Sequence, residues 1–301
     1  MSSIGWGKII LLGEHAVVYG YPALAAALDR GVIVAPVPTT KGMRLDIPAW
    51  NVSVKVDDDH PVARSLAAVA DALELGRPAL SLVGDAQIPH GAGLGSSAAL
   101  AVAIARALLI HAKRAAEPST LAHAATASET LVHGKPSGVD VAMAIAGGIG
   151  VFRRSTGLRS IANPPTLRVL VGPSGVPRST GTMVERVAEA TSSLPGDKRL
   201  SELGGLTDTG TSALLARDLA GLGAAMNRAH ALLAELGVST PELDALCETA
   251  RAGGAYGAKL TGAGGGGAVI AIAPRDKEAG ILAAWRAAGV AGFVAVVGSR
   301  S

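Results

Sequence analysis

The chain has 301 residues, enough for about two domains, and 49% of them are hydrophobic although only 3% are aromatic. A formal net charge of +3 without long basic runs or interleaved aromatic residues argues against a nucleic-acid-binding protein. No apolar run reaches the roughly 18 residues of a membrane span, the N-terminus lacks the features of a secretory signal, and the single Cys247 excludes an intrachain disulfide, so we expect a soluble, cytoplasmic protein.

The first half of the chain alternates short apolar runs, which predict strands, with segments of helical apolar periodicity. Strands are expected at residues 7–12, 23–28, 32–36, 52–56 and 80–83. Helices are expected at 61–75, from 96 to about 114, and at 118–133. A proline at the start of the first and third of these segments is typical of a first helical turn.

The second half follows a segment of small residues, 136–150, that carries Asp140. Asn163, Pro164 and Pro165 are typical of a linker and predict a boundary between domains at residues 1–164 and 165–301. Strands are expected at 150–154, 167–172, 268–273 and 292–297, and helices at 180–193, 211–236, 241–252 and 277–288. Because strands and helices are mixed in both halves, the predicted class is α+β in two domains.

A glycine-rich segment, IPHGAGLGSSAALAVAIARALL, directly precedes the long helix predicted from residue 96. Gly91, Gly93 and Gly95 alternate up to Ser96 and Ser97, where that helix begins. Glycines allow backbone N–H groups to converge on an anion at a helix start, and a serine there can bind a phosphate or a magnesium ion. The alternative is an ordinary serine cap after a loose turn. The segment is not a Walker P-loop, because no lysine stands beside the serines.

Three further segments carry residues suited to nucleotide chemistry. Lys8, Glu14 and His15 stand close together near the N-terminus, Glu129 lies eleven residues before Asp140, and residues 257–267 read GAKLTGAGGGG. Each has an ordinary alternative: a solvated strand end for Lys8, a helix cap for His15 or Asp140, and a turn for the late glycines. The four segments together favour a phosphate-handling enzyme.

These segments resemble the motifs of the GHMP small-molecule kinases. GKIILLGEHAVVYGYPALAAAL, PHGAGLGSSAALAVA and KLTGAGGGG are similar to three family motifs in the family's order, so the resemblance covers residues 7 to about 273. SETLVHGKPSGVDVAMAIAGG resembles the segment that carries the metal-binding glutamate and the catalytic aspartate in members that phosphorylate mevalonate. The GLGSS loop identifies only the superfamily, whereas GEHAVVYG and HGKPSGVD are more specific and argue against a galactokinase.

The resemblance implies an N-terminal α+β domain with a left-handed βαβ crossover and a ferredoxin-like C-terminal domain, with ATP between them. It also implies that Asp140 accepts the proton of the acceptor's primary hydroxyl, while Lys8 keeps Asp140 ionised and stabilises the developing alkoxide. Ser97 and Glu129 would hold Mg²⁺. Residues implied to bind the nucleotide are Gly91, Ala92, Gly93, Leu94, Gly95, Ser96, Ser97, Thr261, Gly262 and Gly264. Residues implied to bind mevalonate are Glu14, His15, Arg178 and Thr180.

The implied reaction is ATP-dependent phosphorylation of the C5 hydroxyl of mevalonate, a step of isoprenoid biosynthesis. One alternative is a GHMP kinase for another acceptor, such as phosphomevalonate, a sugar or homoserine, because a few pocket residues decide the acceptor. Another is a non-catalytic nucleotide-binding sensor, against which the combination of Lys8, Glu129 and Asp140 argues, since binding alone needs no base. A homodimer is compatible with the sequence.

Overall fold

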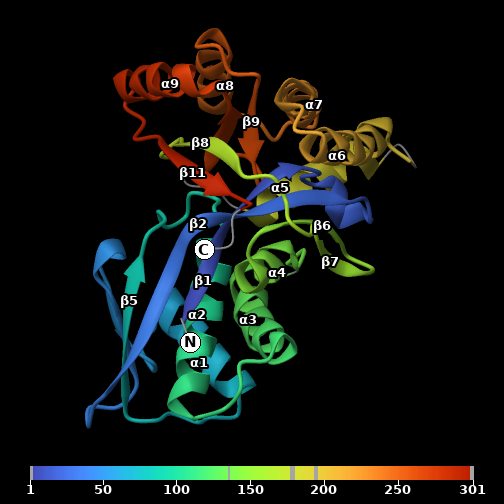
Figure 1. Cartoon of the computed structure of the whole chain (residues 1–301). Coiled ribbons are helices and arrows are strands. Elements are labelled where there is room, and N and C mark those ends of the chain that lie inside the picture. The colour runs from blue at the N-terminus through green and yellow to red at the C-terminus, as the bar shows by residue number, and fades with distance from the viewer. Residues whose placement is uncertain (1–2, 135, 177–179, 193–195, 299–301) are drawn as a thin grey trace. The chain divides into compact units, whose positions relative to one another are not determined.

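The structure is a computed structural model that describes residues 3–134, 136–176, 180–192 and 196–298. The chain forms two compact units. The first contains residues 1–7, 30–90 and 95–147, and the second contains 8–29, 91–94 and 148–301. The chain passes from one unit to the other inside two strands, β1 (Ile4–Leu12) and β2 (Ala23–Pro38) (Figure 1).

The sheet of the first unit has the order β4-β3-β5-β2. Strand β5 is antiparallel to β2, β3 is parallel to β5, and β4 is antiparallel to β3. Along β2, Val32 and Val34 are buried while Ala35 and Val37 are exposed, so one face of the sheet carries the core. The bounds of the other elements are β3 (Arg44–Ile47), η2 (Pro48–Trp50), β4 (Val52–Lys55) and β5 (Leu80–Ala86).

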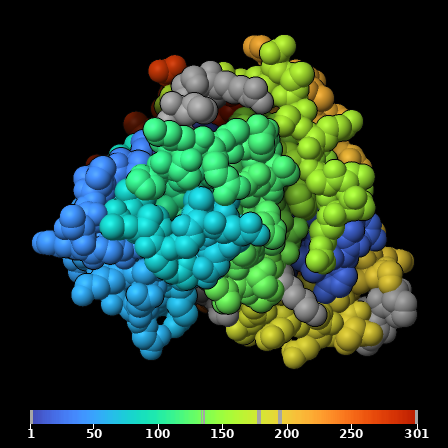
Figure 2. Space-filling view, turned by 90° about the horizontal axis from the view of Figure 1, so that it is seen from below, coloured from blue at the N-terminus to red at the C-terminus, as the bar shows by residue number. Residues whose placement is uncertain are grey.

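The described residues of the first unit also form the α-helices α1 (Pro61–Ala72), α2 (Ser96–His111), α3 (Pro118–His133) and α4 (Val139–Ala146). Helix α2 is buried on nearly every side because it packs against the other three, whereas α1 and α3 lie side by side at the surface (Figure 2). Strand β1 runs directly over α2: a Cβ atom on Gly5 would lie 1.9 Å from the carbonyl oxygen of Ala99. Glycine is therefore required at position 5.

The second unit contains a four-stranded antiparallel sheet of order β11-β8-β10-β9. In chain order these strands follow the pattern 4-1-3-2 of a βαββαβ unit, which confirms the ferredoxin-like prediction. The strands are β8 (Leu167–Pro173), β9 (Gly257–Thr261), β10 (Ala268–Ile272) and β11 (Phe293–Val297). The helices are α5 (Thr180–Ser192), α6 (Lys198–Leu215), α7 (Leu219–Glu235), α8 (Pro241–Ala252) and α9 (Arg275–Ala287).

The second unit also contains the first half of β2, which pairs with β6 (Ile149–Arg153), and β6 pairs with β7 (Gly157–Ser160). The short helix η1 (Ala16–Tyr19) follows β1. Of the helices in the described part of the chain, none has both the length and the apolar character needed to cross a membrane.

The mixed α+β class is confirmed, but several predicted elements were wrong. The two strands predicted at 23–28 and 32–36 are one strand, β2, and the helix predicted at 211–236 is divided between α6 and α7. The division falls at Arg217, whose φ of 59° no helix accommodates, and Asp218 then caps α7 by accepting from Gly221 N. Strands β3 and β7, the start of α6 and helix α4 were not predicted. Strand β9 was interpreted as part of the glycine loop.

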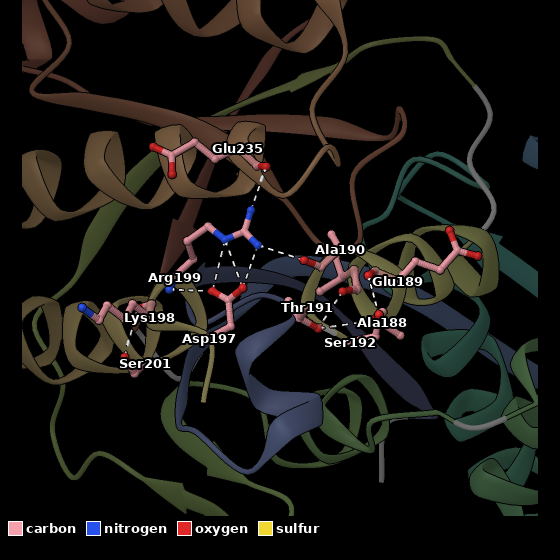
Figure 3. Close-up of polar contacts among 11 residues, drawn as sticks. Ala188, Glu189, Ala190, Thr191, Ser192, Asp197, Lys198, Arg199, Ser201 and Glu235 are labelled. Carbon is pink, nitrogen blue, oxygen red and sulfur yellow. Dashed lines mark hydrogen bonds and ion pairs between the residues drawn. The ribbon is translucent and has the colours of Figure 1, made fainter. Parts of the chain in front are cut away.

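A partly buried charge cluster, made of the buried Asp197 and the half-buried Arg199, joins three helices of the second unit (Figure 3). The carboxylate of Asp197 caps α6 and binds Arg199, and hydrogen bonding to Arg199 lowers the pKa of Asp197. The same guanidinium donates to the carbonyl oxygens of Ala190 at 3.0 Å and Glu235 at 3.2 Å, near the ends of α5 and α7. Arg199 therefore satisfies carbonyls that the helices leave without internal partners.

We expect Arg199→Met to lower the free energy of unfolding by about 2 kcal/mol, because it removes charged hydrogen bonds and leaves Asp197 without its cation. Urea denaturation measures the effect. Arg228→Met is the matched control, because the pair between Arg228 and Glu202 is exposed, and its effect should be much smaller. Equal effects of the two substitutions would contradict the role assigned to Arg199.

Candidate active site

The glycine-rich segment forms a turn at the start of α2, as predicted. Gly91, Gly93 and Gly95 have φ angles of 72°, 78° and 72°, a region that favours glycine. Gly95 occupies the cap position and has no side chain that could bond the first-turn N–H groups, so these groups are suited to an anion. The backbone N–H of the buried Lys8 donates to the carbonyl oxygen of Leu94 at 2.8 Å, which holds the turn against β1.

Asp140 lies at a second helix start that is also preceded by a glycine. Gly138, with φ of 89°, caps α4, and Asp140 is the second residue of this helix. The positive end of the helix dipole stabilises a carboxylate at that position. The segment 136–150, which was predicted only as rich in small residues, thus presents its one carboxylate at a helix terminus.

Arg106 of α2 holds α4 in place. Its Nη2 donates to the carbonyl oxygen of Ile145 at 3.0 Å, and its Nη1 donates to that of Ile4 in β1. Burial lowers the pKa of Arg106. Sequence reasoning assigned no role to this residue, although a single charge inside the apolar run 98–109 was a usable signal.

Glu129 is buried on α3, with 1% of its surface exposed. It shares the buried stripe of the helix with Leu121 and Ala125, at intervals of four residues. The hydroxyls of Ser128 and Ser65 are 2.5 Å apart, which fixes α3 against α1. Helices α2, α3 and α4 pack against one another, so Ser97, Glu129 and Asp140 come from three adjoining helices of one unit.

The Ser97 hydroxyl and the Glu129 carboxylate are chemically suited to binding Mg²⁺. Carboxylate and hydroxyl oxygens are the ligands that Mg²⁺ accepts, and the ion usually keeps waters and substrate phosphates as its remaining ligands. The residues that the structure describes contain no group of three or more His, Cys, Asp or Glu side chains able to hold a metal by themselves. Ser97 and Glu129 could hold such an ion together with phosphate oxygens of a substrate.

In the second unit, Glu14 forms a fully buried ion pair with Lys259. The Nζ atom of Lys259 donates to Oε1 of Glu14 and, at 2.6 Å, to the carbonyl oxygen of Leu260. Burial raises the pKa of Glu14 and lowers that of Lys259, and the attraction between the two charges opposes both shifts. The other oxygen of Glu14, Oε2, is buried and has no hydrogen-bond partner within the described residues.

His15 and Thr261 connect β1 and its following turn to the end of β9 and to residues 262–267, the late glycine loop. The His15 Nε2 atom lies 2.8 Å from the carbonyl oxygen of Ala263, and because a carbonyl only accepts, Nε2 carries the proton. The Thr261 hydroxyl accepts from Ile10 N at 2.9 Å and donates to Ile10 O at 3.1 Å. A Cβ atom on Gly264 would lie 2.1 Å from the carbonyl oxygen of Val238, so the loop requires glycine there.

The predicted site residues are divided between the two units. Residues 95–97, Glu129 and Asp140 belong to the first, and Lys8, Glu14, His15, residues 91–94, Thr180 and residues 261–264 belong to the second. Thr180 is the first residue of α5 and is partly exposed. Arg178 lies outside the described residues. The role of each residue in binding or catalysis stays a prediction.

Two side chains of α7 form hydrogen bonds with the outer edge of β9, the strand that carries Lys259. Asn227 Oδ1 accepts from Ala258 N at 3.0 Å, and His230 Nδ1 accepts from Leu260 N at 3.3 Å. His230 Nε2 therefore carries the proton and faces Asp244 Oδ1 at 3.1 Å. A strand edge would otherwise present unpaired backbone groups, so these contacts fix the position of β9.

Asp244, His230 and Cys247 contact one another in the sequence carboxylate, imidazole and thiol, as in a catalytic triad, but they do not have the charges that such a triad needs. The Cys247 Sγ atom lies 3.9 Å from His230 Nδ1. Burial raises the pKa of the Cys247 thiol to about 12 and lowers that of His230 to about 4. Both shifts oppose a thiolate–imidazolium pair, so the cluster is structural.

Two family models match this chain, GHMP kinases N terminal domain at residues 61–148 and GHMP kinases C terminal at residues 211–291. A mevalonate kinase of Thermococcus sibiricus is 35% identical to it, over 94% of this chain and 91% of that kinase. The chain belongs to the GHMP kinase family and is a kinase. The boundary predicted after residue 164 lies between the two matched segments and stays a prediction.

Two solved mevalonate kinases of this family have the same fold as this chain. The structure of L. major mevalonate kinase in complex with R-mevalonate has a TM-score of 0.87 and 27% identity, covering all of this chain and 97% of that one. The Methanococcus jannaschii mevalonate kinase has a TM-score of 0.85 and 25% identity, covering all of this chain and 98% of that one. Both likenesses extend through the whole fold.

We expect His230 to make the stability of the protein depend on pH between about 6.5 and 4. Because its folded-state pKa of about 4 lies below the ordinary 6.5, the unfolded chain binds a proton more readily as the pH falls through this window. His230→Asn keeps an acceptor for Leu260 N but cannot titrate. Urea unfolding should show that the wild type loses about 2 kcal/mol more than this variant between pH 7.5 and pH 5. Parallel losses would show that His230 does not titrate in this way.

Proposed function

We propose that this kinase transfers the γ-phosphoryl group of ATP to the C5 hydroxyl of mevalonate, giving 5-phosphomevalonate for isoprenoid biosynthesis. The observation that carries the proposal is 35% identity with a mevalonate kinase over 94% of the chain. The likeness to a mevalonate kinase in complex with R-mevalonate supports it. Members of one superfamily differ in acceptor, so the fold alone does not define the substrate.

In the proposed reaction, the C5 oxygen attacks the γ-phosphorus while the bond between that phosphorus and the β,γ-bridging oxygen breaks. Asp140 accepts the hydroxyl proton, and ADP leaves with the bridging oxygen. Lys8 stabilises the negative charge that develops on the attacking oxygen. An aspartate is a weak base at its ordinary pKa, so Asp140 acts partly by orienting the hydroxyl.

The nucleotide phosphates are bound in this proposal by backbone N–H groups of residues 91–97 at the start of α2. Thr261, at the end of β9, and Gly262 and Gly264, in the glycine loop that follows it, are the other proposed nucleotide-binding residues. On the acceptor side, Glu14, His15, Arg178 and Thr180 are the proposed mevalonate-binding residues. Positioning of donor and acceptor provides much of the catalysis of phosphoryl transfer.

Ser97 and Glu129 are the proposed protein ligands of Mg²⁺. When bound, the ion neutralises charge on the β- and γ-phosphates. The Glu129 carboxylate is held on the buried face of α3 and the Ser97 hydroxyl in the first turn of α2, so neither ligand depends on a long surface loop.

We propose the cytoplasm as the compartment in which the enzyme works. A reducing compartment suits a chain whose single cysteine, Cys247, is buried. A homodimer remains the proposed assembly to test by light scattering.

The acceptor is tested by measuring ADP release from ATP and Mg²⁺ with four compounds side by side: mevalonate, phosphomevalonate, galactose and homoserine. We expect turnover with mevalonate alone, and its loss on addition of EDTA. Turnover with another acceptor in place of mevalonate would identify a different GHMP kinase. Turnover with none, combined with nucleotide binding, would favour the sensor alternative.

We expect Asp140→Asn to lower turnover by about 10²- to 10⁴-fold, the usual contribution of a general base. Steady-state kinetics with saturating ATP and mevalonate measures the change. Asp57→Asn, at an exposed position of the same unit, is the matched control and should leave turnover unchanged. Turnover close to that of the wild type in Asp140→Asn would remove Asp140 from the mechanism.

A further inference from the structure

Three side-chain links join the end of β1 and its following turn to the end of β9 and its following loop. Thr261 bonds the backbone of Ile10, Lys259 bonds Glu14, and His15 bonds the carbonyl oxygen of Ala263. Lys259 and Thr261 are two residues apart on β9 and therefore share one face of the strand. Residues separated by about 250 positions in the chain thus form one contact region of the second unit, which consists of residues 10–15 and 259–263.

The backbone of this contact region is strained at His15, and other contacts must stabilise it. His15 has a φ of 58° and a ψ of −47°, and Ala16 N donates to the carbonyl oxygen of Glu14 at 2.6 Å, so His15 is the central residue of a γ-turn with positive φ, a strained conformation that a residue with a Cβ seldom adopts. A conformation of this kind is unfavourable by itself and persists only where the surrounding contacts over-determine it. The Glu14–Lys259 pair on one side and the His15–Ala263 hydrogen bond on the other provide that support.

The support depends on the charge of Lys259. The Glu14 side chain has 1% of its surface exposed, so water cannot stabilise its carboxylate. Lys259 is its hydrogen-bonded cation, and Lys8 adds a weaker attraction. Without Lys259, Glu14 must bind a proton or move toward solvent, and either change shifts its neighbour His15.

We propose that Lys259 is a positioning residue for phosphoryl transfer, which holds the turn of residues 13–15 against the glycine loop that follows Thr261. The inference rests on the proposed function, because it assigns His15 to the acceptor and residues 261–264 to the nucleotide. The predicted contribution of Glu14 to mevalonate binding is then exerted through His15. Lys259 sets the spacing of the two binding segments and touches neither substrate.

The experiment compares four proteins: wild type, Lys259→Met, Glu14→Gln and the double variant Glu14→Gln/Lys259→Met. Lys277→Met, at an exposed position on α9, is the matched control for loss of a lysine charge. Circular dichroism establishes the folded fraction of each protein. The readouts are kcat with mevalonate per folded molecule, the dissociation constant of ADP by calorimetry, and amide hydrogen exchange without ligands.

We expect Lys259→Met to lower kcat about 10²-fold while the dissociation constant of ADP changes by less than about threefold, because displacement of a binding segment costs turnover before it costs nucleotide affinity. Exchange should rise in both residues 13–18 and residues 261–267. The double variant, which has no buried charge left unpaired, should recover at least about tenfold in kcat over Lys259→Met. Lys277→Met should match the wild type.

A normal kcat in folded Lys259→Met, or a double variant no better than Lys259→Met, would overturn the proposal. Should Lys259→Met fail to fold, Glu14→Gln is judged by hydrogen exchange: faster exchange at 261–267 supports the link, and unchanged exchange overturns it. Hydrogen exchange needs no acceptor. A wild type that transfers no phosphate to mevalonate would therefore overturn the proposed function alone.

Discussion

A buried charge needs a partner, and this requirement organises the second unit around Glu14 and Lys259. Neither side chain reaches water, so the turn after β1 and the strand β9 must lie where the two charges meet. The edge of β9 is in turn held by Asn227 and His230, whose side chains complete the hydrogen bonding of the strand. The late glycine loop starts from this fixed strand.

In the first unit, small residues allow the strand β1 and the helices to pack closely. Helix α2 is rich in alanine, and β1 passes over it at Gly5 with no room for a side chain. Close packing of this kind brings three helices together, and α2 and α4 each begin after a glycine with a positive φ, Gly95 and Gly138. Arg106 then bonds the carbonyl oxygen of Ile145, so the C-terminal end of the helix that carries Asp140 is fixed to α2.

Local signals predicted those parts of the fold in which neighbouring residues decide the conformation. The start of α2 at Ser96 followed from three alternating glycines, and the starts of α1 and α3 followed from proline in the first turn. Strand β3 has four residues and owes its conformation to pairing with β4 and β5, so its own sequence carries little signal. Strand β9 was not predicted for the same reason. Its sequence, GAKLT, contains glycine and lysine, and its strand conformation depends on pairing with β10.

The sequence by itself determined the family motifs, the α+β class and the residues that are candidates for phosphate, metal and acceptor binding. It did so because these depend on residue type and on short spacing along the chain. Only the tertiary structure decided that Lys259 neutralises Glu14, that Arg106 bonds the carbonyl groups of Ile4 and Ile145, and that His230 serves as a neutral acceptor. The physical reason is that burial and hydrogen bonding between distant residues set the charge and the role of a side chain, and neither can be read from its neighbours in the chain.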